Sequence, residues 1–185
     1  MDNKALRKEL QEISGDGDFE SHAVRIAALS SRFGCSIRAL SGYDQISRKN
    51  FNCFEHALDL NEHLQNSTLI TLSELGVLVD HHFIGYLKAL GVLKEKAFDD
   101  LQDGDLVVYF DNTGAQHAGK WSRGRVISKW GAGLLYDHGL LETPLQYGTP
   151  RFFEIIPGPN VRDYLLKYAK EEKGVPEEYL SQSHF

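Results

Sequence analysis

Residues 50–60 read NFNCFEHALDL, and this stretch predicts a helix that begins beside a cysteine. The side-chain oxygen of Asn50 or Asn52 can cap such a helix by accepting from a free backbone N–H. Apolar residues then recur at helical spacing as far as Leu64, so one face of the helix is expected to look inward. We expect the helix to run to about Gln65.

Cys53 falls in the first turn of this predicted helix. Free N–H groups and the positive end of the helix dipole favour a thiolate there, and the thiolate is the nucleophilic form. We therefore expect the pKa of Cys53 to be lowered, and Cys53 to be alkylated faster than Cys35 at about pH 6 to 7. The alternative is an inert core residue, because free cysteine is often a buried filler.

The length, charge and cysteine content of the chain exclude several classes of protein. A chain of 185 residues suffices for one domain, or for one domain with a helical extension. The net charge of −6, without a basic stripe, gives no electrostatic footprint for nucleic acid. Two cysteines form no disulfide framework and suit a reducing compartment.

The start of the chain is charged and helix-like, which differs from the apolar core of a secretory signal. No stretch approaches ~18 uninterrupted apolar residues, so no membrane span is expected. We expect a cytoplasmic protein. The alternative is an effector exported without a signal peptide, for which an immunity or regulatory partner is expected.

Two amphipathic helical patterns precede the cysteine, over residues 3–13 and 19–33. Residues 14–18 (SGDGD) form a turn between them, since they lack the later glycine and final glutamate of a calcium loop. Residues 1–45 are thus predicted to be a helical extension that carries no chemistry.

After Gly91 the pattern changes from helices to strands, with one more helix expected just before it, over residues 80–90. Runs rich in β-branched and aromatic residues predict strands over residues 105–110, 116–121, 125–130, 134–138 and 151–156. Short turns between neighbouring strands indicate an antiparallel meander. A helix over residues 160–172 and a polar tail over residues 173–185 follow. Helices followed by antiparallel strands define an α+β domain, placed here at residues 46–172.

Three motifs occur in order along this domain: Asn52-Cys53 at a helix start, GDLVVYF at residues 104–110, and His117-Ala118-Gly119 on the next strand. In this order they resemble the NlpC-type cysteine peptidases, compact papain-like enzymes related to the CHAP amidases. The likeness covers roughly residues 50–156. It implies a papain-like fold in which the helix-borne Cys53 is the nucleophile, His117 is its base, and a polar residue on the following strand orients that histidine.

Ser128-Lys129-Trp130-Gly131, His138 and Tyr147-Gly148 extend the likeness to an uncharacterised bacterial group of NlpC-like proteins. That group has Asn-Cys before an Ala-Leu helix, a histidine strand, Trp/Ser-Lys-x-Gly, a later histidine and Tyr-Gly. The chain departs from the peptidases at residues 52–55, where NCFE replaces the usual Asp-Cys-Ser-Gly. It departs again where Ser128 or Lys129 stands in place of a frequent histidine, so the resemblance supports the fold better than the substrate.

A Cys–His pair needs the thiol and the imidazole within hydrogen-bond reach, so that the imidazole takes the proton. We expect Cys53 Sγ and a ring nitrogen of His117 to lie within roughly 4.5 Å. Ser128, Gln116 and His138 are the candidates for orienting His117. Register favours Ser128, because a turn at residues 122–124 brings it close to the level of His117.

The remaining site residues have less specific roles. His138 is then expected to be a cleft residue that faces the substrate. The Asn52 amide and the Cys53 backbone N–H are expected to form an oxyanion hole. Lys129 is expected to be a surface cation or a substrate clamp.

Two other classes of function compete with a hydrolase. Cys53 and His56 share a helix face and, with His81, His82 or His117, could bind zinc; these residues form no recognised ligand pattern, so no metal or other cofactor is expected. The second is a catalytically silent NlpC-like module that binds a partner, because fold does not fix function. The favoured expectation is a cysteine hydrolase that cleaves an amide bond in a peptide, a peptidoglycan stem or a protein side chain.

Overall fold

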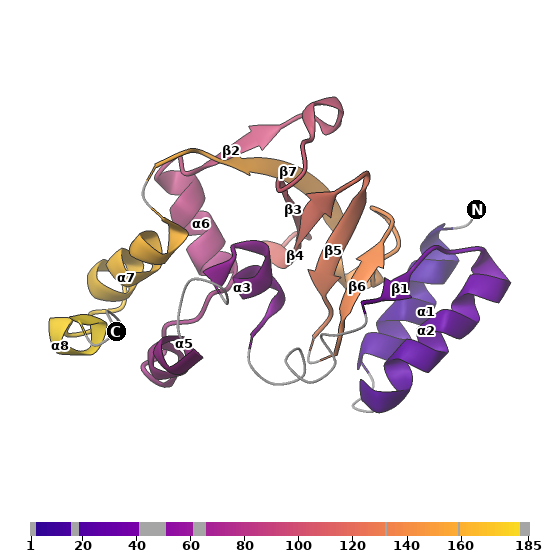
Figure 1. The fold of residues 1–185 in the computed structure, drawn as a ribbon, viewed down its shortest axis with the longest axis horizontal. Coiled ribbons are helices and arrows are strands. Elements are labelled where there is room, and N and C mark those ends of the chain that lie inside the picture. The colour runs from indigo at the N-terminus through magenta and orange to yellow at the C-terminus, as the bar shows by residue number, and fades with distance from the viewer. Residues whose placement is uncertain are drawn as a thin grey trace.

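The computed structural model describes residues 3–15, 19–40, 51–60, 66–131, 133–158 and 160–181. In this part of the chain, helices flank a seven-stranded antiparallel sheet, so the protein is of the mixed α+β class (Figure 1). No helix in these ranges combines the length and the apolar character needed to cross a membrane.

The helices are α1 (Asn3–Gly15), α2 (Phe19–Phe33), α3 (Cys53–Ala57), α5 (Asn66–Glu74), α6 (His81–Ala89), α7 (Val161–Glu171) and α8 (Glu177–Ser181), with 3₁₀ turns η1 (Phe98–Asp100) and η2 (Leu145–Tyr147). The strands are β1 (Arg38–Ala39), β2 (Leu93–Lys96), β3 (Leu106–Phe110), β4 (Ala115–Ser122), β5 (Arg125–Lys129), β6 (Leu135–His138) and β7 (Thr149–Ile155).

The strand order is β1-β6-β5-β4-β3-β7-β2, so β3 to β6 form the predicted meander. β7 returns to the free edge of β3, where Leu106 lies opposite Phe153. β2 then pairs with β7 and was not predicted. Its sequence, LKEK, is short and charged, as is common for an edge strand that must not recruit another chain.

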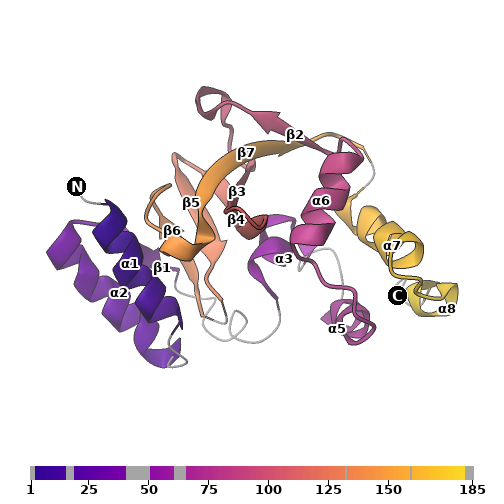
Figure 2. The same cartoon turned by 180° about the vertical axis from the view of Figure 1, so that it is seen from behind.

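Alternation along the strands divides the core between the two faces of the sheet. Leu106 and Val108 of β3 pack in a cluster with α3, α6 and α7, whereas Val107 and Tyr109 pack in a cluster with α1. Figures 1 and 2 show α1 and α2 beside β1 at one end of the molecule, α6 and α7 on the opposite side, and α3 between them and the sheet. The first face is called the α3 face below and the second the α1 face.

α2 has the predicted bounds, whereas α1 continues past its predicted end at residue 13 to Gly15, and α1 packs directly on the sheet domain. Leu6 and Leu10 of α1 are fully buried in the α1-face cluster. Arg7, between them, is also buried and donates hydrogen bonds to the carbonyls of Thr143 and Gly148. These contacts tie α1 to the segment around η2.

The larger departures from the prediction are in α3 and in the C-terminal tail. α3 ends at Ala57, because Leu58 caps it and Asp59 adopts a left-handed φ of 57°. Residues 61–65 of the predicted helix lie outside the described residues. The predicted polar tail contains α8, and Val175 and Leu180 bury their side chains in the α3-face cluster. Two apolar residues among charges give too little periodicity to predict this packing.

Gly148 is the position at which a small substitution is expected to damage the fold most clearly. Its φ is +86°, and an added Cβ would overlap the carbonyl of Phe110. Gly148→Ala is therefore expected to lower the free energy of unfolding by roughly 2–4 kcal/mol, through backbone strain and overlap together. Gly174→Ala is the matched control, since its φ of +68° is strained too but nothing lies near its Cβ. Equal losses in urea unfolding would show that close packing at Gly148 contributes nothing.

Candidate active site

Cys53 is the first residue of α3, and Asn52 caps the helix. Asn52 Oδ1 accepts from the backbone N–H groups of Phe54 (2.8 Å) and Glu55 (2.9 Å). The Asn52 backbone N–H donates to Glu55 Oε2 (2.6 Å), which completes a capping box. The sequence therefore fixes the start of this helix locally, with Asn52 as the cap; Asn50, the other candidate, lies outside the described residues.

α3 crosses the sheet so that its two ends lie over different strands. Near its C-terminal end, Asp59 forms an ion pair with Lys120 of β4. At its N-terminal end, the ring of Phe51 lies 5.4 Å from Lys129 Nζ of β5. Cys53 therefore lies beside the part of β4 that precedes the described β4–β5 ladder, which begins on β4 at the pair Lys120↔Ile127, and the Ala118 N–H contacts its sulfur.

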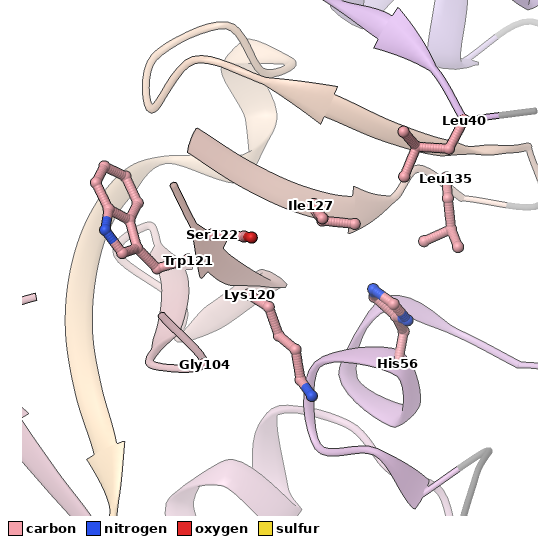
Figure 3. A pocket seen from close by; sticks show the side chains of 8 residues that line it. All are labelled: Leu40, His56, Gly104, Lys120, Trp121, Ser122, Ile127 and Leu135. Carbon is pink, nitrogen blue, oxygen red and sulfur yellow. The ribbon is translucent and has the colours of Figure 1, made fainter. Parts of the chain in front are cut away.

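A pocket of about 220 Å³ lies between α3 and strands β4 to β6 (Figure 3). It is lined by Leu40, His56, Gly104, Lys120, Trp121, Ser122, Ile127 and Leu135. Figure 3 shows the His56 ring directed from α3 towards Leu135, and the Lys120 amine directed towards α3. His56 Nε2 is buried without a hydrogen-bond partner among the described residues. The pKa of His56 falls to about 4, chiefly through burial and then through the charge of Lys120.

The Cys53 thiol is protonated in this environment. Burial raises the pKa of Cys53 to about 11, although hydrogen bonds from the backbone N–H groups of Ala118, Phe54 and Cys53 itself act in the opposite direction. The Glu55 carboxylate raises this pKa further. The predicted lowering of the Cys53 pKa is therefore wrong. α3 has only five residues, so its dipole is too weak to offset desolvation.

His117 is a neutral, buried imidazole on β4, with 1% of its surface exposed. Its ring stacks on Tyr147 of η2, with centroids 4.0 Å apart and an interplanar angle of 11°. His117 Nε2 has no hydrogen-bond partner among the described residues. Burial, followed by the charges of His138 and His56, holds the pKa of His117 well below its ordinary value. An imidazole that stays neutral keeps a lone pair with which to accept a proton.

The backbone of His117 adjoins Cys53, since the next residue, Ala118, directs its N–H to the Cys53 sulfur. The side chain of His117 follows a different direction. His117 lies opposite Tyr109 in the β3–β4 ladder, so its ring begins on the α1 face. No hydrogen bond joins Cys53 to His117 in the described part of the chain. Their approach within roughly 4.5 Å stays a prediction.

Ser128 forms its hydrogen bond with His138 rather than with His117. The hydroxyl of Ser128 bonds to His138 Nε2 (2.8 Å) and accepts from Trp130 Nε1 (3.0 Å). His138 Nδ1 lies 2.9 Å from the carbonyl of Gly139, to which it must donate. This bond assigns Nε2 as the acceptor and Ser128 as the donor.

This network departs from the predicted roles of both residues. The register Lys120↔Ile127 puts Ser128 at the level of Gly119, beyond His117. Ser128 and His138 are both completely buried, so His138 is not exposed in an open cleft. The predicted contact between Ser128 and His117 is absent from the described residues. A shift of a residue or two in the register accounts for the difference.

The two amide side chains of the predicted site bind elsewhere. Gln116 Nε2 donates to Asp111 Oδ1 (3.0 Å) and Thr113 Oγ1 (2.8 Å), so Gln116 secures the β3–β4 turn. Asn52 Nδ2 donates to the carbonyl of Val79 (3.0 Å). The Cys53 backbone N–H at the start of α3 is thus better placed than the Asn52 amide for an oxyanion hole.

Lys129 is buried, with 2% of its surface exposed, so the expectation of a surface cation is wrong. Its Nζ donates to the carbonyls of Gly131 and Gly133, each at 3.2 Å. Burial lowers the pKa of Lys129, while the Cys53 and Glu55 charges raise it. Alternation with Ile127 in a short strand was the sequence signal that pointed to a buried position for this lysine.

Possible metal ligands gather away from the cysteine. Asp80, His81 and His82 at the start of α6 have ligand atoms within 4.8 Å of one another, and His81 and His82 are exposed. Among the described residues, Cys53 and His56 belong to no group of three such ligands. The zinc alternative built on Cys53 therefore lacks its coordination set here.

Sequence reasoning assigned no part in the hydrolase site to three residues of this region, although it considered His56 as a zinc ligand. Glu55 and His56 follow it on α3, and the spacing of Asn52 and Glu55 is itself the signal of a capping box. Tyr147 comes from η2, far along the chain, and only its place in a Tyr-Gly motif marked it.

No family model, curated protein or solved structure shows significant similarity to this chain. The resemblance to NlpC-type peptidases therefore rests on the sequence motifs alone. In the structure, Cys53 begins a helix, the helix lies on an antiparallel sheet, and the strands of His117 and Lys129 pass beside its first turn.

Proposed function

We propose that this chain is a cysteine hydrolase that cleaves amide bonds, with Cys53 as the nucleophile and His117 as the base, in a papain-like, NlpC-type domain. One observation carries the proposal: a neutral imidazole with an unpartnered nitrogen belongs to the residue preceding the N–H that contacts the Cys53 sulfur. Buried polar atoms without partners are rare in proteins and call for an explanation. A base that awaits the thiol proton supplies one.

The chemistry follows the sequence of a general-base mechanism. As Cys53 Sγ attacks the carbonyl carbon of the amide, the thiol proton passes to His117 and the carbonyl oxygen becomes an oxyanion. The Cys53 backbone N–H donates to that oxyanion. His117 returns the proton to the departing amine, which leaves a thioester on Cys53. Water, deprotonated by His117, then releases the acid and restores the thiol.

The pocket beside α3 suits one substrate side chain. Its volume of about 220 Å³ and its walls of Leu40, Ile127 and Leu135 favour an aliphatic or small aromatic group. The unpartnered Nε2 of His56 offers that group one hydrogen bond. A peptide, a peptidoglycan stem and a protein side-chain amide all present such groups near an amide bond.

A silent binding module is the second candidate, and one observation favours it. The pKa of Cys53 is raised to about 11, as expected of an unreactive core thiol. In a binding module, the same pocket would hold a partner side chain without any covalent step.

Acylation by p-nitrophenyl acetate separates the two candidates without knowledge of the substrate. The hydrolase is expected to release p-nitrophenol in a burst and to carry an acetyl group on Cys53, mapped by peptide mass spectrometry. Cys35, buried beside Ser30, is the internal control and is expected to stay unmodified. Acetylation confined to lysines, or equal on both cysteines, would leave the binding module as the function.

A further inference from the structure

The buried Lys129 ammonium has no role in the proposed mechanism so far, and its burial is costly. An ammonium group out of water loses much more solvation than two neutral carbonyls restore. Lys129 donates to the carbonyls of Gly131 and Gly133 and forms no ion pair with a carboxylate of the described residues. The Glu55 carboxylate attracts this ammonium through space without a direct ion pair, so the same ammonium can also attract a negative charge that appears transiently nearby.

The register places Lys129 beneath the first turn of α3. Lys129 lies opposite Leu135, and Ile127, two residues before it, lies opposite Lys120, so these side chains share the α3 face. Along that face, Asp59 contacts Lys120, and His56 lines the pocket with Ile127 and Leu135. From these contacts, α3 runs so that its N-terminal end lies over Lys129. The contact between Lys129 Nζ and the Phe51 ring agrees with this direction. Cys53 is the first residue of that helix end.

The other ionisable groups around Cys53 supply no positive charge. Glu55 on α3 is an acid, and Tyr147 on η2 is a buried phenol. His117 on β4 and His56 on α3 are kept neutral by burial, which lowers the pKa of each. An imidazolium therefore does not neutralise the sulfur in the resting site.

We propose that Lys129 is the residue that stabilises the negative charge of Cys53 when its thiol proton leaves. This inference rests on the proposed function for its purpose, although the electrostatic pairing can be measured by itself. Lys129 acts through Cys53 and touches no substrate atom in this assignment, so it is a positioning residue. Its ammonium keeps its proton throughout, and the only proton that moves is the one from Cys53 to the base.

The test compares Lys129→Met with Lys94→Met. Lys94 is the control, because it also lies on a strand of the sheet but is exposed, is paired with Glu154 and lies outside the proposed site. The rate of Cys53 alkylation by iodoacetamide is measured from about pH 7 to 11, with the modified peptide identified by mass spectrometry. Lys129→Met is expected to slow alkylation about tenfold at every pH below about 10, which corresponds to a rise of about one unit in the titration of Cys53. Lys94→Met is expected to change the rate less than about twofold.

An unchanged titration in a folded Lys129→Met protein would overturn the inference. Circular dichroism checks the fold, and Met keeps the length of the buried stem. A second measurement needs no variant: a cation beside the sulfur favours iodoacetate over neutral iodoacetamide. The wild-type rate ratio for Cys53 is expected to exceed that of glutathione several-fold, and an equal or smaller ratio would also overturn the inference.

The outcomes separate this inference from the proposed function. Slower alkylation of Lys129→Met, without any acetyl transfer by the wild type, would refute the hydrolase and uphold the electrostatic pairing. Acetyl transfer with an unaltered Lys129→Met titration would uphold the hydrolase and refute the role of Lys129.

Discussion

His117→Ala is expected to slow the acetylation of Cys53 by p-nitrophenyl acetate about a thousandfold at pH 7, because a positioned general base contributes roughly 10²–10⁴ in rate. The raised pKa of Cys53 leaves the thiol protonated at this pH, so attack requires a base that takes the proton as the bond forms. His117 is neutral and has a ring nitrogen without a partner. The burst of p-nitrophenol gives the rate constant directly.

Two controls distinguish a lost base from a damaged fold. His81→Ala removes an exposed histidine on α6 and is expected to leave the burst unchanged. Added imidazole is expected to restore part of the activity of His117→Ala, since it can enter the vacated space and accept the proton. A His117→Ala protein that acetylates Cys53 at the wild-type rate would show that His117 is not the base.

The pH dependence of the same burst tests whether the pKa of His117 is lowered, as its burial requires. A general base works in its neutral form, and burial keeps the pKa of His117 well below 6.5. The rate is therefore expected to stay level as the pH falls from 7 to about 6, where an ordinary imidazole would already lose activity. A midpoint at the ordinary histidine value would contradict the buried position of the ring.

Acid is expected to destabilise the fold through His138. Burial lowers the pKa of His138 from 6.5 to about 4. Between pH 6.5 and pH 4, His138 is therefore protonated in the unfolded chain but neutral in the folded chain. Stability is thus fully present above about pH 6.5 and is lost progressively as the pH falls towards 4. The loss amounts to about 3 kcal/mol for this residue, and His117 adds a loss in the same direction.

Urea unfolding at several pH values measures this loss. His138→Gln removes the titrating group, and its amide can still pair with Ser128. The free energy of unfolding of this variant is expected to fall less steeply between pH 6.5 and 4, by up to one proton in slope. His82→Gln, at an exposed position, is the control and should keep the wild-type slope. Identical slopes for wild type and His138→Gln would remove His138 from the acid response.

The sequence predicted the elements with strong periodicity. α1, α2, α6 and the strands from β3 to β7 match because their apolar residues recur at helical or alternating spacing, and caps such as Asp80 mark their ends. β2 and α8 were not predicted, because each is short and rich in charged residues. Tertiary packing rather than a local sequence pattern determines these two elements.

The candidate site was predictable where local geometry decides it. The start of α3 at Cys53 follows from the Asn52–Glu55 capping box alone. The pairing of Ser128 was not predictable, because its position along the α1 face decides whether its hydroxyl meets His117 or His138, and the turn specifies that position only to within a residue or two. The raised pKa of Cys53 was missed too, since it depends on how deeply packing of α3 against β4 removes water from the sulfur.

The most direct test of the account is a crystal structure of this chain with Cys53 trapped by a peptide vinyl sulfone. The account predicts a thioether to Cys53 Sγ and a ring nitrogen of His117 within roughly 4.5 Å of that sulfur. It also predicts the inhibitor's side chain in the pocket beside His56. A His117 ring that stays stacked on Tyr147, farther from Cys53 than one bridging water can span, would contradict the Cys53–His117 pair and with it the proposed hydrolase.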